Sequence, residues 1–303
     1  MSPSLTPDLD RSWDRSTHCA LWWRNTPPLS NHRVGLVGQF YAEDEAAAAE
    51  ALQFACRTLT EQGCTLAIGP MDGNPWQHYR WVTERGSEPP FFLEPENPEA
   101  YPRYFLDQGF SPIAHYRSAL SADLNVTDPR LQPVRDRLQR MGVSIRSLNL
   151  ANLDAELRQI YAIVTTSFRH NFLYVPIPEP AFITQYHALL PFLKPEFVWL
   201  AEHQQRTIGF LFTVPNWREL EQGQAIRTII LKTIAVLPER QYAGLGQVLF
   251  EHCHAIAAEA GYDRALYALV HDANPCANLV RRYAQPIRRY ALFAKPLTTL
   301  TST

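Results

Sequence analysis

The alternation of apolar and polar residues is most informative between positions 226 and 260. Residues 226–236 are almost continuously apolar and rich in β-branched side chains, as in a strand at the centre of a sheet. Pro238 ends that strand. Apolar residues then recur at three- and four-residue intervals up to Ala260, and Gly261 stands where a helix would stop. The pattern therefore predicts a buried strand, a short turn and a helix over residues 244–260.

The rest of the second half divides into further strands and helices. Two apolar runs flank Gln204-Gln205-Arg206, which predicts a hairpin there. The remaining elements follow from the same two periodicities. We expect strands at 144–150, 197–203, 207–214, 265–270 and 287–295, and helices at 153–168, 179–190 and 276–283.

The first half repeats part of this order. Its pattern predicts strands at 20–23, 33–41, 64–68 and 113–120, helices at 45–62 and 76–83, and a proline-rich loop at 88–102. A charged segment that opens with Asp128-Pro129 predicts a linker helix over 127–141. We therefore expect a flexible leader (1–19), a first domain (20–124), a linker helix (125–143) and a second domain (144–303).

The turn before helix 244–260 carries a candidate anion site. Its sequence fits the pattern Gln/Arg-x-x-Gly-x-Gly/Ala, and the missing side chains at Gly244 and Gly246 let backbone N–H groups approach an anion at a helix N-terminus. The pattern predicts a pyrophosphate site. It would be formed by Gln241, Tyr242, Ala243, Gly244, Leu245, Gly246 and Gln247.

This strand, turn and helix resemble motif A of the GNAT acyltransferase superfamily, whose members carry acetyl-CoA or a longer acyl-CoA. The element order extends the resemblance to residues 144–297. It implies an α/β (α+β) fold in two related domains, each a mixed, largely antiparallel sheet flanked by helices. The first domain would be a degenerate GNAT-like copy. At its equivalent turn, Glu43, Asp44 and Glu45 would repel a pyrophosphate, so we expect one CoA site.

The resemblance also implies which residues touch the cofactor. In GNAT enzymes the central strand pairs with the pantetheine arm, and this role would fall to Ile234, Ala235 and Val236. Asn274 matches an asparagine that the family often directs toward pantetheine. The simpler alternatives are core packing for the strand residues and an Asn-Pro turn for Asn274.

Catalytic groups are less clearly indicated. Many GNAT enzymes place a carboxylate on the central strand, but residues 226–236 contain no Asp or Glu. Glu202 is the nearest substitute as a base, with a water chain as the other route and a solvated strand-end charge as the simpler interpretation. Tyr283 is the candidate proton donor for the leaving thiolate, although the family pattern would put that tyrosine at Val280 or Arg281.

Composition limits the class of partner. With 46% hydrophobic residues and a net charge of −2, the chain is expected to be a soluble globular protein that binds a small molecule, not nucleic acid or a membrane. Five scattered cysteines predict neither disulfides nor a metal site and favour the cytoplasm. We expect a monomer or a homodimer.

These observations predict an acyl-CoA-dependent N-acyltransferase that transfers directly to a primary amine, which we expect to belong to a small molecule. A covalent acyl-enzyme is not expected, because Cys253 and Cys276 lie on predicted helices. The aromatic segment 168–174 would cover the acceptor. Aromatic residues of the first half could contribute, although packing between domains is favoured for them; they are Trp76, Tyr79, Phe91 and Phe92. The alternative is a non-catalytic CoA-binding or scaffold protein.

Overall fold

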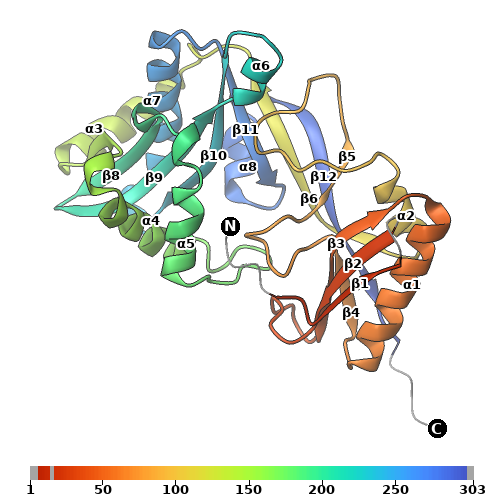
Figure 1. The fold of residues 1–303 in the computed structure, drawn as a ribbon. Coiled ribbons are helices and arrows are strands. Elements are labelled where there is room, and N and C mark those ends of the chain that lie inside the picture. Colours follow the sequence, from red (N-terminus) through yellow and green to blue (C-terminus); the bar gives the residue numbers. More distant parts are fainter. Residues whose placement is uncertain (1–5, 14–16, 299–303) are drawn as a thin grey trace.

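The computed structural model describes residues 6–13 and 17–298, which fold around one 12-stranded sheet (Figure 1). The strand order is β1-β2-β3-β4-β12-β6-β11-β10-β9-β8-β7, with β5 beside β12. The strands are β1 (Leu9–Ser12), β2 (Thr17–Trp22), β3 (Val34–Ala42), β4 (Leu66–Gly69), β5 (Trp81–Glu84), β6 (Ser111–Ser121), β7 (Ser144–Ser147), β8 (Val198–His203), β9 (Arg206–Pro215), β10 (Thr228–Val236), β11 (Arg264–His271) and β12 (Gln285–Pro296).

Helices cover the sheet in both halves. Helix α1 packs on β2 and β3, whereas α4 and α7 pack on β9 and β10. The helices are α1 (Glu45–Glu61), α2 (Tyr101–Asp107), α3 (Gln132–Arg140), α4 (Leu153–Ser167), α5 (Glu179–His187), α6 (Trp217–Glu221), α7 (Leu245–Glu259) and α8 (Pro275–Val280). Within the described ranges, no helix is long and apolar enough to cross a bilayer.

The sheet is mixed and mostly antiparallel, which confirms the predicted fold class. Only β3 with β4 and β10 with β11 run parallel among the paired strands of the described chain. Each parallel pair is joined by one helix, α1 in the first half and α7 in the second. The two halves therefore contain the same strand–helix–strand unit, as the repeated sequence pattern predicts.

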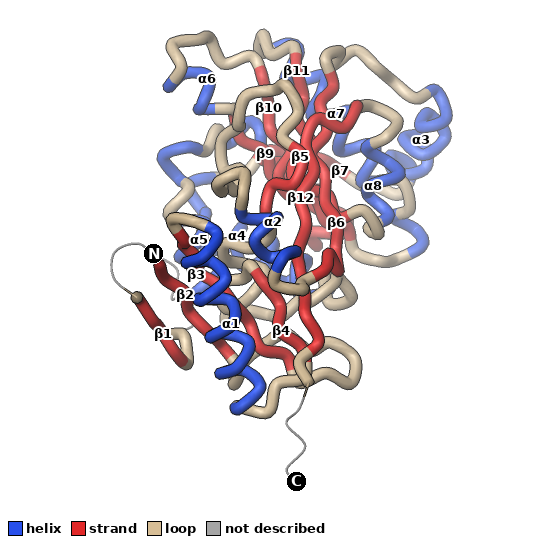
Figure 2. Tube along the Cα trace, turned by 90° about the vertical axis from the view of Figure 1, so that its right-hand side faces the viewer, coloured by secondary structure: helices blue, strands red, loops and turns tan. Residues whose placement is uncertain are grey.

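The last strand of each half lies beside a strand of the other half. Strand β6 comes from the first half but pairs with β11, and β12 comes from the second half but pairs with β4. The two exchanged strands pair with each other, with Tyr116 opposite Tyr290 (Figure 2). The domain boundaries at 124 and 144 stay a prediction, because this exchange joins both halves in one sheet.

Three segments differ from the sequence-based expectations. Leu9–Ser12, within the expected flexible leader, pairs with β2. The helix expected at 76–83 is absent from the described chain, and Trp81–Glu84 instead forms β5 beside β12. The loop expected at 88–102 runs into α2 (Tyr101–Asp107), whose Tyr101 and Phe105 are buried in the first-half core.

Candidate functional site

The glycine turn lies at the start of α7, as the sequence predicts. Gly244 is the N-terminal cap of that helix and has φ of 88°, a left-handed conformation that favours glycine. Among the residues that the structure describes, no acceptor faces the backbone N–H groups of Gly244, Leu245 and Gly246. These unpaired donors at a helix N-terminus fit an anionic group such as a pyrophosphate.

The linker helix α3 covers one side of this turn. Val134 approaches so closely that a Cβ at Gly244 would lie 2.8 Å from its Cγ1 atom. Arg137 donates to the backbone carbonyl of Ala243. Glycine is therefore required at position 244 for packing as well as for its φ angle.

Three side chains of the turn point into the protein, whereas Gln241 and Ala243 are exposed. Tyr242 donates to or accepts from His203 over 2.9 Å, and Leu245 is fully buried. Gln247 donates to the Tyr283 hydroxyl at 2.7 Å, while Gln241 bonds the exposed Glu239. The buried side chains therefore leave main-chain amides, together with the exposed Gln241, to contact an anion at this turn.

Strands β10 and β11 separate after Leu231. They pair from Thr228 to Leu231, and beyond that point β10 pairs only with β9, after a register shift at Lys232. Strand β11 has its own irregularity, where Leu269 adopts φ of 60°. The separation leaves one edge of β10 without a neighbouring strand from Thr233 to Val236.

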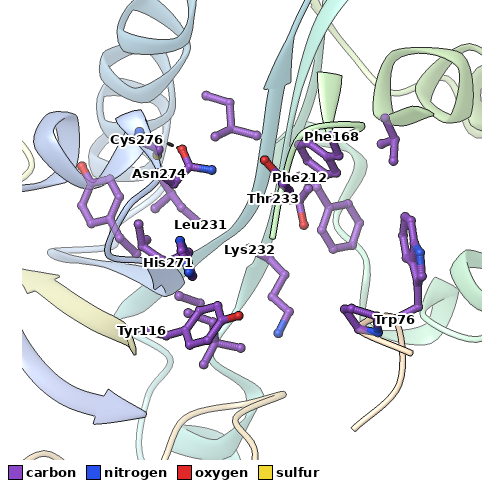
Figure 3. A pocket seen from close by; sticks show the side chains of 18 of the residues that line it. Trp76, Tyr116, Phe168, Phe212, Leu231, Lys232, Thr233, His271, Asn274 and Cys276 are labelled. Atoms are coloured by element: carbon purple, nitrogen blue, oxygen red, sulfur yellow. Dashed lines mark hydrogen bonds between the residues drawn. The ribbon is translucent and has the colours of Figure 1, made fainter. Parts of the chain in front are cut away.

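A cavity of about 850 Å³ fills the space between the separated strands (Figure 3). Ile234 and Asn274 line it on the cleft side, and Phe168 lies over it from the end of α4. Trp76 and Tyr79 also line it, so the first half contributes to the cavity. Phe91 is buried in the core, and Phe92 packs against Phe192 outside the lining. A volume of this size suits a small-molecule site.

Ile234 connects this cavity to the glycine turn. It lines the cavity, and its Cδ1 atom would lie 3.5 Å from a Cβ placed on Gly246. The residues of the turn do not themselves line the cavity. Ala235 is buried, and the carbonyl of Val236 accepts from Ser167 at 3.1 Å. The glycine turn and the cavity are therefore neighbours, with the Ile234 side chain between them.

The two predicted catalytic residues lie away from the cavity lining. Glu202 accepts from Arg146 at 2.6 Å, and Arg146 also donates to Glu156. The Tyr283 hydroxyl donates to Glu251 at 3.0 Å, and burial raises the pKa of Tyr283 to about 12. Their catalytic roles stay predictions, and both side chains have structural partners.

Residues around α8 line the cleft instead. Asn274 caps this helix by accepting from the Cys276 backbone N–H at 2.9 Å, as drawn in Figure 3. Val280, one of the two positions where the family pattern would place the tyrosine, lines the cavity. Cys276 also lines it, and burial raises the pKa of its thiol to about 11. At pH 7 that group is a thiol and a poor nucleophile.

Three basic side chains of the cavity were missed by the sequence analysis. Lys232 projects from the register shift of β10 toward the space that Tyr116 and His271 also face (Figure 3). Burial, with a smaller effect of Arg80, lowers the pKa of Lys232 to about 7. Burial also lowers the pKa of His271. A lysine inside an otherwise apolar strand was the available signal for the first; Arg80 and His271 had none.

The equivalent opening in the first half is filled by the chain itself. Strands β3 and β4 pair from Val34 to Leu36, and residues 70–72, called the plug here, then lie against β3. Met71 donates its backbone N–H to Val37 at 2.9 Å. The Asp72 carboxylate accepts from the Gln39 backbone N–H at 2.6 Å. The plug thus uses the strand edge that is open in β10.

Metal ligands do not gather in the described part of the chain, where no group of three or more His, Cys, Asp or Glu side chains could hold an ion. The five cysteines are all free.

Comparison with known proteins finds a family match in the second half. The family model "Acetyltransferase (GNAT) family" matches residues 157–282. Protein YghO of Escherichia coli (strain K12) is 23% identical over 267 residues, which covers 79% of this chain and 68% of that protein.

Two solved structures share the fold over most of the chain. A GCN5-related glucosamine N-acetyltransferase region of a fungal multi-domain β-N-acetylglucosaminidase has a TM-score of 0.54 and 13% identity over 92% of this chain, which spans 31% of that protein. A tandem GNAT protein from the clavulanic acid biosynthesis pathway has a TM-score of 0.52 and 13% identity, covering 95% of this chain and 81% of that one.

Proposed function

We propose that this chain, whose residues 157–282 match the acetyltransferase (GNAT) family model, transfers an acyl group from acetyl-CoA or another acyl-CoA directly to a primary amine of a small molecule. The observation that carries the proposal is the cleft between β10 and β11, which opens into the cavity beside the unpaired amides of Gly244 to Gly246.

The chain's own residues would position the two substrates. The turn amides would hold the pyrophosphate of the acyl-CoA, and the free edge of β10 at Ile234 to Val236 would hold its extended arm. The amine would enter from the wall that Trp76 and Tyr79 form. Holding both reactants in one cavity replaces a bimolecular encounter by a positioned reaction.

The reaction requires a neutral amine. Its nitrogen attacks the thioester carbon, a C–N bond forms, the C–S bond breaks, the nitrogen loses one proton and the sulfur leaves as a thiol that has gained one. His271 lines the cavity, and its lowered pKa keeps the imidazole neutral at pH 7 and able to accept a proton. The protonated thiol of Cys276 favours direct transfer over an acyl-enzyme.

The second candidate is a non-catalytic CoA-binding protein. Outside the cavity, Glu202 is bound by Arg146, and Tyr283 is bound by Gln247 and Glu251. These contacts favour a protein that retains the cofactor-binding turn but does not use Glu202 and Tyr283 for catalysis. For either candidate function we propose a cytoplasmic location. The support is that all five cysteines are free, as expected in a reducing compartment.

One experiment separates the candidates. Purified protein is titrated with acetyl-CoA, and release of free thiol is then measured with a panel of primary amines. A transferase raises its melting temperature with acetyl-CoA and releases thiol with at least one amine. A binding protein shows the shift alone. A melting temperature unmoved by saturating acetyl-CoA and by longer acyl-CoA esters refutes both.

A further inference from the structure

Arg80 is a buried cation without an acidic partner. It directly precedes β5, is 8% exposed, and lines the cavity. Its guanidinium carbon lies 4.0 Å from the ring centroid of Tyr79 and 4.4 Å from that of Tyr116. One amino group donates to the carbonyl of Leu269 at 3.4 Å, but its buried Nε atom has no acceptor. Since arginine stays charged in proteins, this cation lacks a counter-ion inside the structure.

Lys232 brings a second cation to the same wall. Its ammonium group donates to the backbone carbonyl of Leu93 at 3.2 Å. Arg80 is close enough to lower its pKa, and no carboxylate within the described chain forms an ion pair with it. Two like charges that approach each other in a protein interior are unfavourable unless an anion joins them.

The one carboxylate among the cavity-lining residues does not neutralise this pair. Glu94 is 1% exposed at its side chain and lies 3.1 Å from the guanidinium of Arg288. It also accepts from the hydroxyl of Tyr290 and from the backbone N–H of Phe91. Glu94 forms its ion pair with Arg288 and only partly offsets the pKa-lowering effects of burial and Arg80 on Lys232, so this one carboxylate faces three basic side chains.

Polar atoms without partners also lie on the neighbouring wall. The Tyr174 hydroxyl and the Gln185 Oε1 atom are buried, line the cavity and have no hydrogen-bond partner. The Gln185 Nε2 atom donates to the carbonyl of Trp76 at 3.4 Å, so its oxygen is left to accept. A ligand with polar groups beyond its anionic end would satisfy these atoms.

We propose that Arg80 and Lys232 form an anion subsite that selects an amine acceptor carrying an oxyanion group, either a carboxylate or a phosphate. The inference rests on the proposed transferase function, because it assigns one end of the acceptor in that reaction. The anionic group binds between the two cations, and the remainder of the acceptor extends along the wall of Trp76, Tyr174 and Gln185.

Binding measurements without acyl-CoA test this subsite. Calorimetric titration compares amino acids, including β-alanine and γ-aminobutyrate, with their carboxamides, and O-phosphoethanolamine with ethanolamine. We expect at least one charged probe to bind tenfold or more tightly than its neutral counterpart, and the better arm identifies the oxyanion. Arg80→Gln and Lys232→Met should each weaken that probe tenfold or more and leave acetyl-CoA affinity within twofold.

A matched control is Lys295→Met, which removes a lysine whose ammonium donates to Gln108 in the first half, outside the cavity. Equal binding of charged and neutral probes, or no effect of either cavity substitution, would overturn the subsite. Thiol release with uncharged amines in the same protein would leave the transferase standing. Conversely, anion binding that depends on Arg80, without thiol release, would keep the subsite and reject the transferase.

Discussion

The two strand–helix–strand units of this molecule use the same topology but treat the space between their parallel strands differently. In the first half, the plug pairs with β3 through Met71 and Asp72, and a Cβ at Gly38 would lie 2.3 Å from the Met71 carbonyl oxygen. In the second half, the chain after β11 turns away, and the cavity occupies the corresponding space.

The turns before α1 and α7 also differ in whether the protein's own groups occupy the helix N-terminus. Asp44 caps α1 by accepting from the Ala47 N–H at 2.8 Å, so a carboxylate of the protein occupies the helix N-terminus. Gly244 caps α7 without a side chain and leaves amides unpaired. The comparison shows that a duplicated fold loses a ligand site when its own chain supplies the hydrogen bonds that the ligand would make.

The largest expected effect tests the open turn. Gly246→Asp should weaken acetyl-CoA binding about 30- to 1,000-fold, because a carboxylate facing a diphosphate costs on the order of 2 to 4 kcal/mol near a protein surface. Gly246→Ala is the matched control, since a Cβ there meets only Ile234 and Val236 at ordinary contact distances. Calorimetry measures both, with Asp44→Ala in the first half expected to leave binding unchanged. Equal affinities of the Asp and Ala variants would contradict the turn as the pyrophosphate site.

The next effect concerns the end of the open cleft. His271→Gln should lower kcat about 100-fold, as expected for loss of a proton acceptor. Because burial lowers the pKa of His271 below its ordinary value near 6.5, wild-type kcat should be level at neutral pH and fall only at acidic pH. The variant should lose this acidic decline. His78→Gln, on the opposite wall of the cavity, should keep it. An unchanged pH profile in His271→Gln would exclude the imidazole as the base.

A stability measurement sharpens the comparison further. Lys232→Met should raise the free energy of unfolding at pH 7 by about 2 kcal/mol. A lysine whose pKa falls from about 10.4 in the unfolded chain to about 7 in the folded chain would destabilise the fold by roughly 4.6 kcal/mol, and we expect a smaller value because Lys232 is partly exposed. Unfolded lysine keeps its proton up to about pH 10.4, whereas folded Lys232 releases it near pH 7. The free energy of unfolding of the wild-type protein should therefore rise as the pH increases from about 7 to about 10.4. The additional stability of Lys232→Met should shrink over the same range.

Urea unfolding at several pH values measures this gain. Lys295→Met is the control, and we expect no pH-dependent stabilisation from it. A lower stability of Lys232→Met at pH 7 would show that the lysine is structurally favourable and not retained for a ligand.

The smallest expected effect tests the plug. Asp72→Ala removes the acceptor of the Gln39 N–H and should lower the free energy of unfolding by about 1 to 2 kcal/mol. Acetyl-CoA should still bind at one molecule per chain, since Met71 keeps its bond to Val37. Asp10→Ala, at an exposed ion pair with His18, should change stability by less than about 0.5 kcal/mol. A second equivalent of bound acetyl-CoA would contradict the plugged first half.

The sequence predicts local features well where one periodicity dominates. The run at 226–236, the glycine turn and the helix after it appear in the structure as β10, Gly244 and α7. The helix predicted at 76–83 is wrong, because Trp76 and Tyr79 line the cavity and Trp81 pairs with β12. Helical spacing in the sequence indicates neither contact. The contacts of the cavity are long-range, so Arg80 gave no signal before its neighbours were known.

The strand exchange was also beyond the sequence pattern. Residues 113–120 and 287–295 were identified as strands, but periodicity does not state which strands pair. Lys232 illustrates the same limit: its charge within an apolar strand was visible, whereas the register shift that turns it into the cavity depends on the pairing of β9 and β10.

The position of β12 between β4 and β6 also sets an order of events during synthesis. Both neighbours are made long before residue 285 leaves the ribosome. Until then β4 lacks a partner at one edge, and β6 lacks partners at both edges until β11 is made and at one edge afterwards. The sheet of the first half can therefore be completed only after the second half has emerged. A nascent chain halted before β12 would expose the unpaired edges of β4 and β6, which can pair with other chains and aggregate.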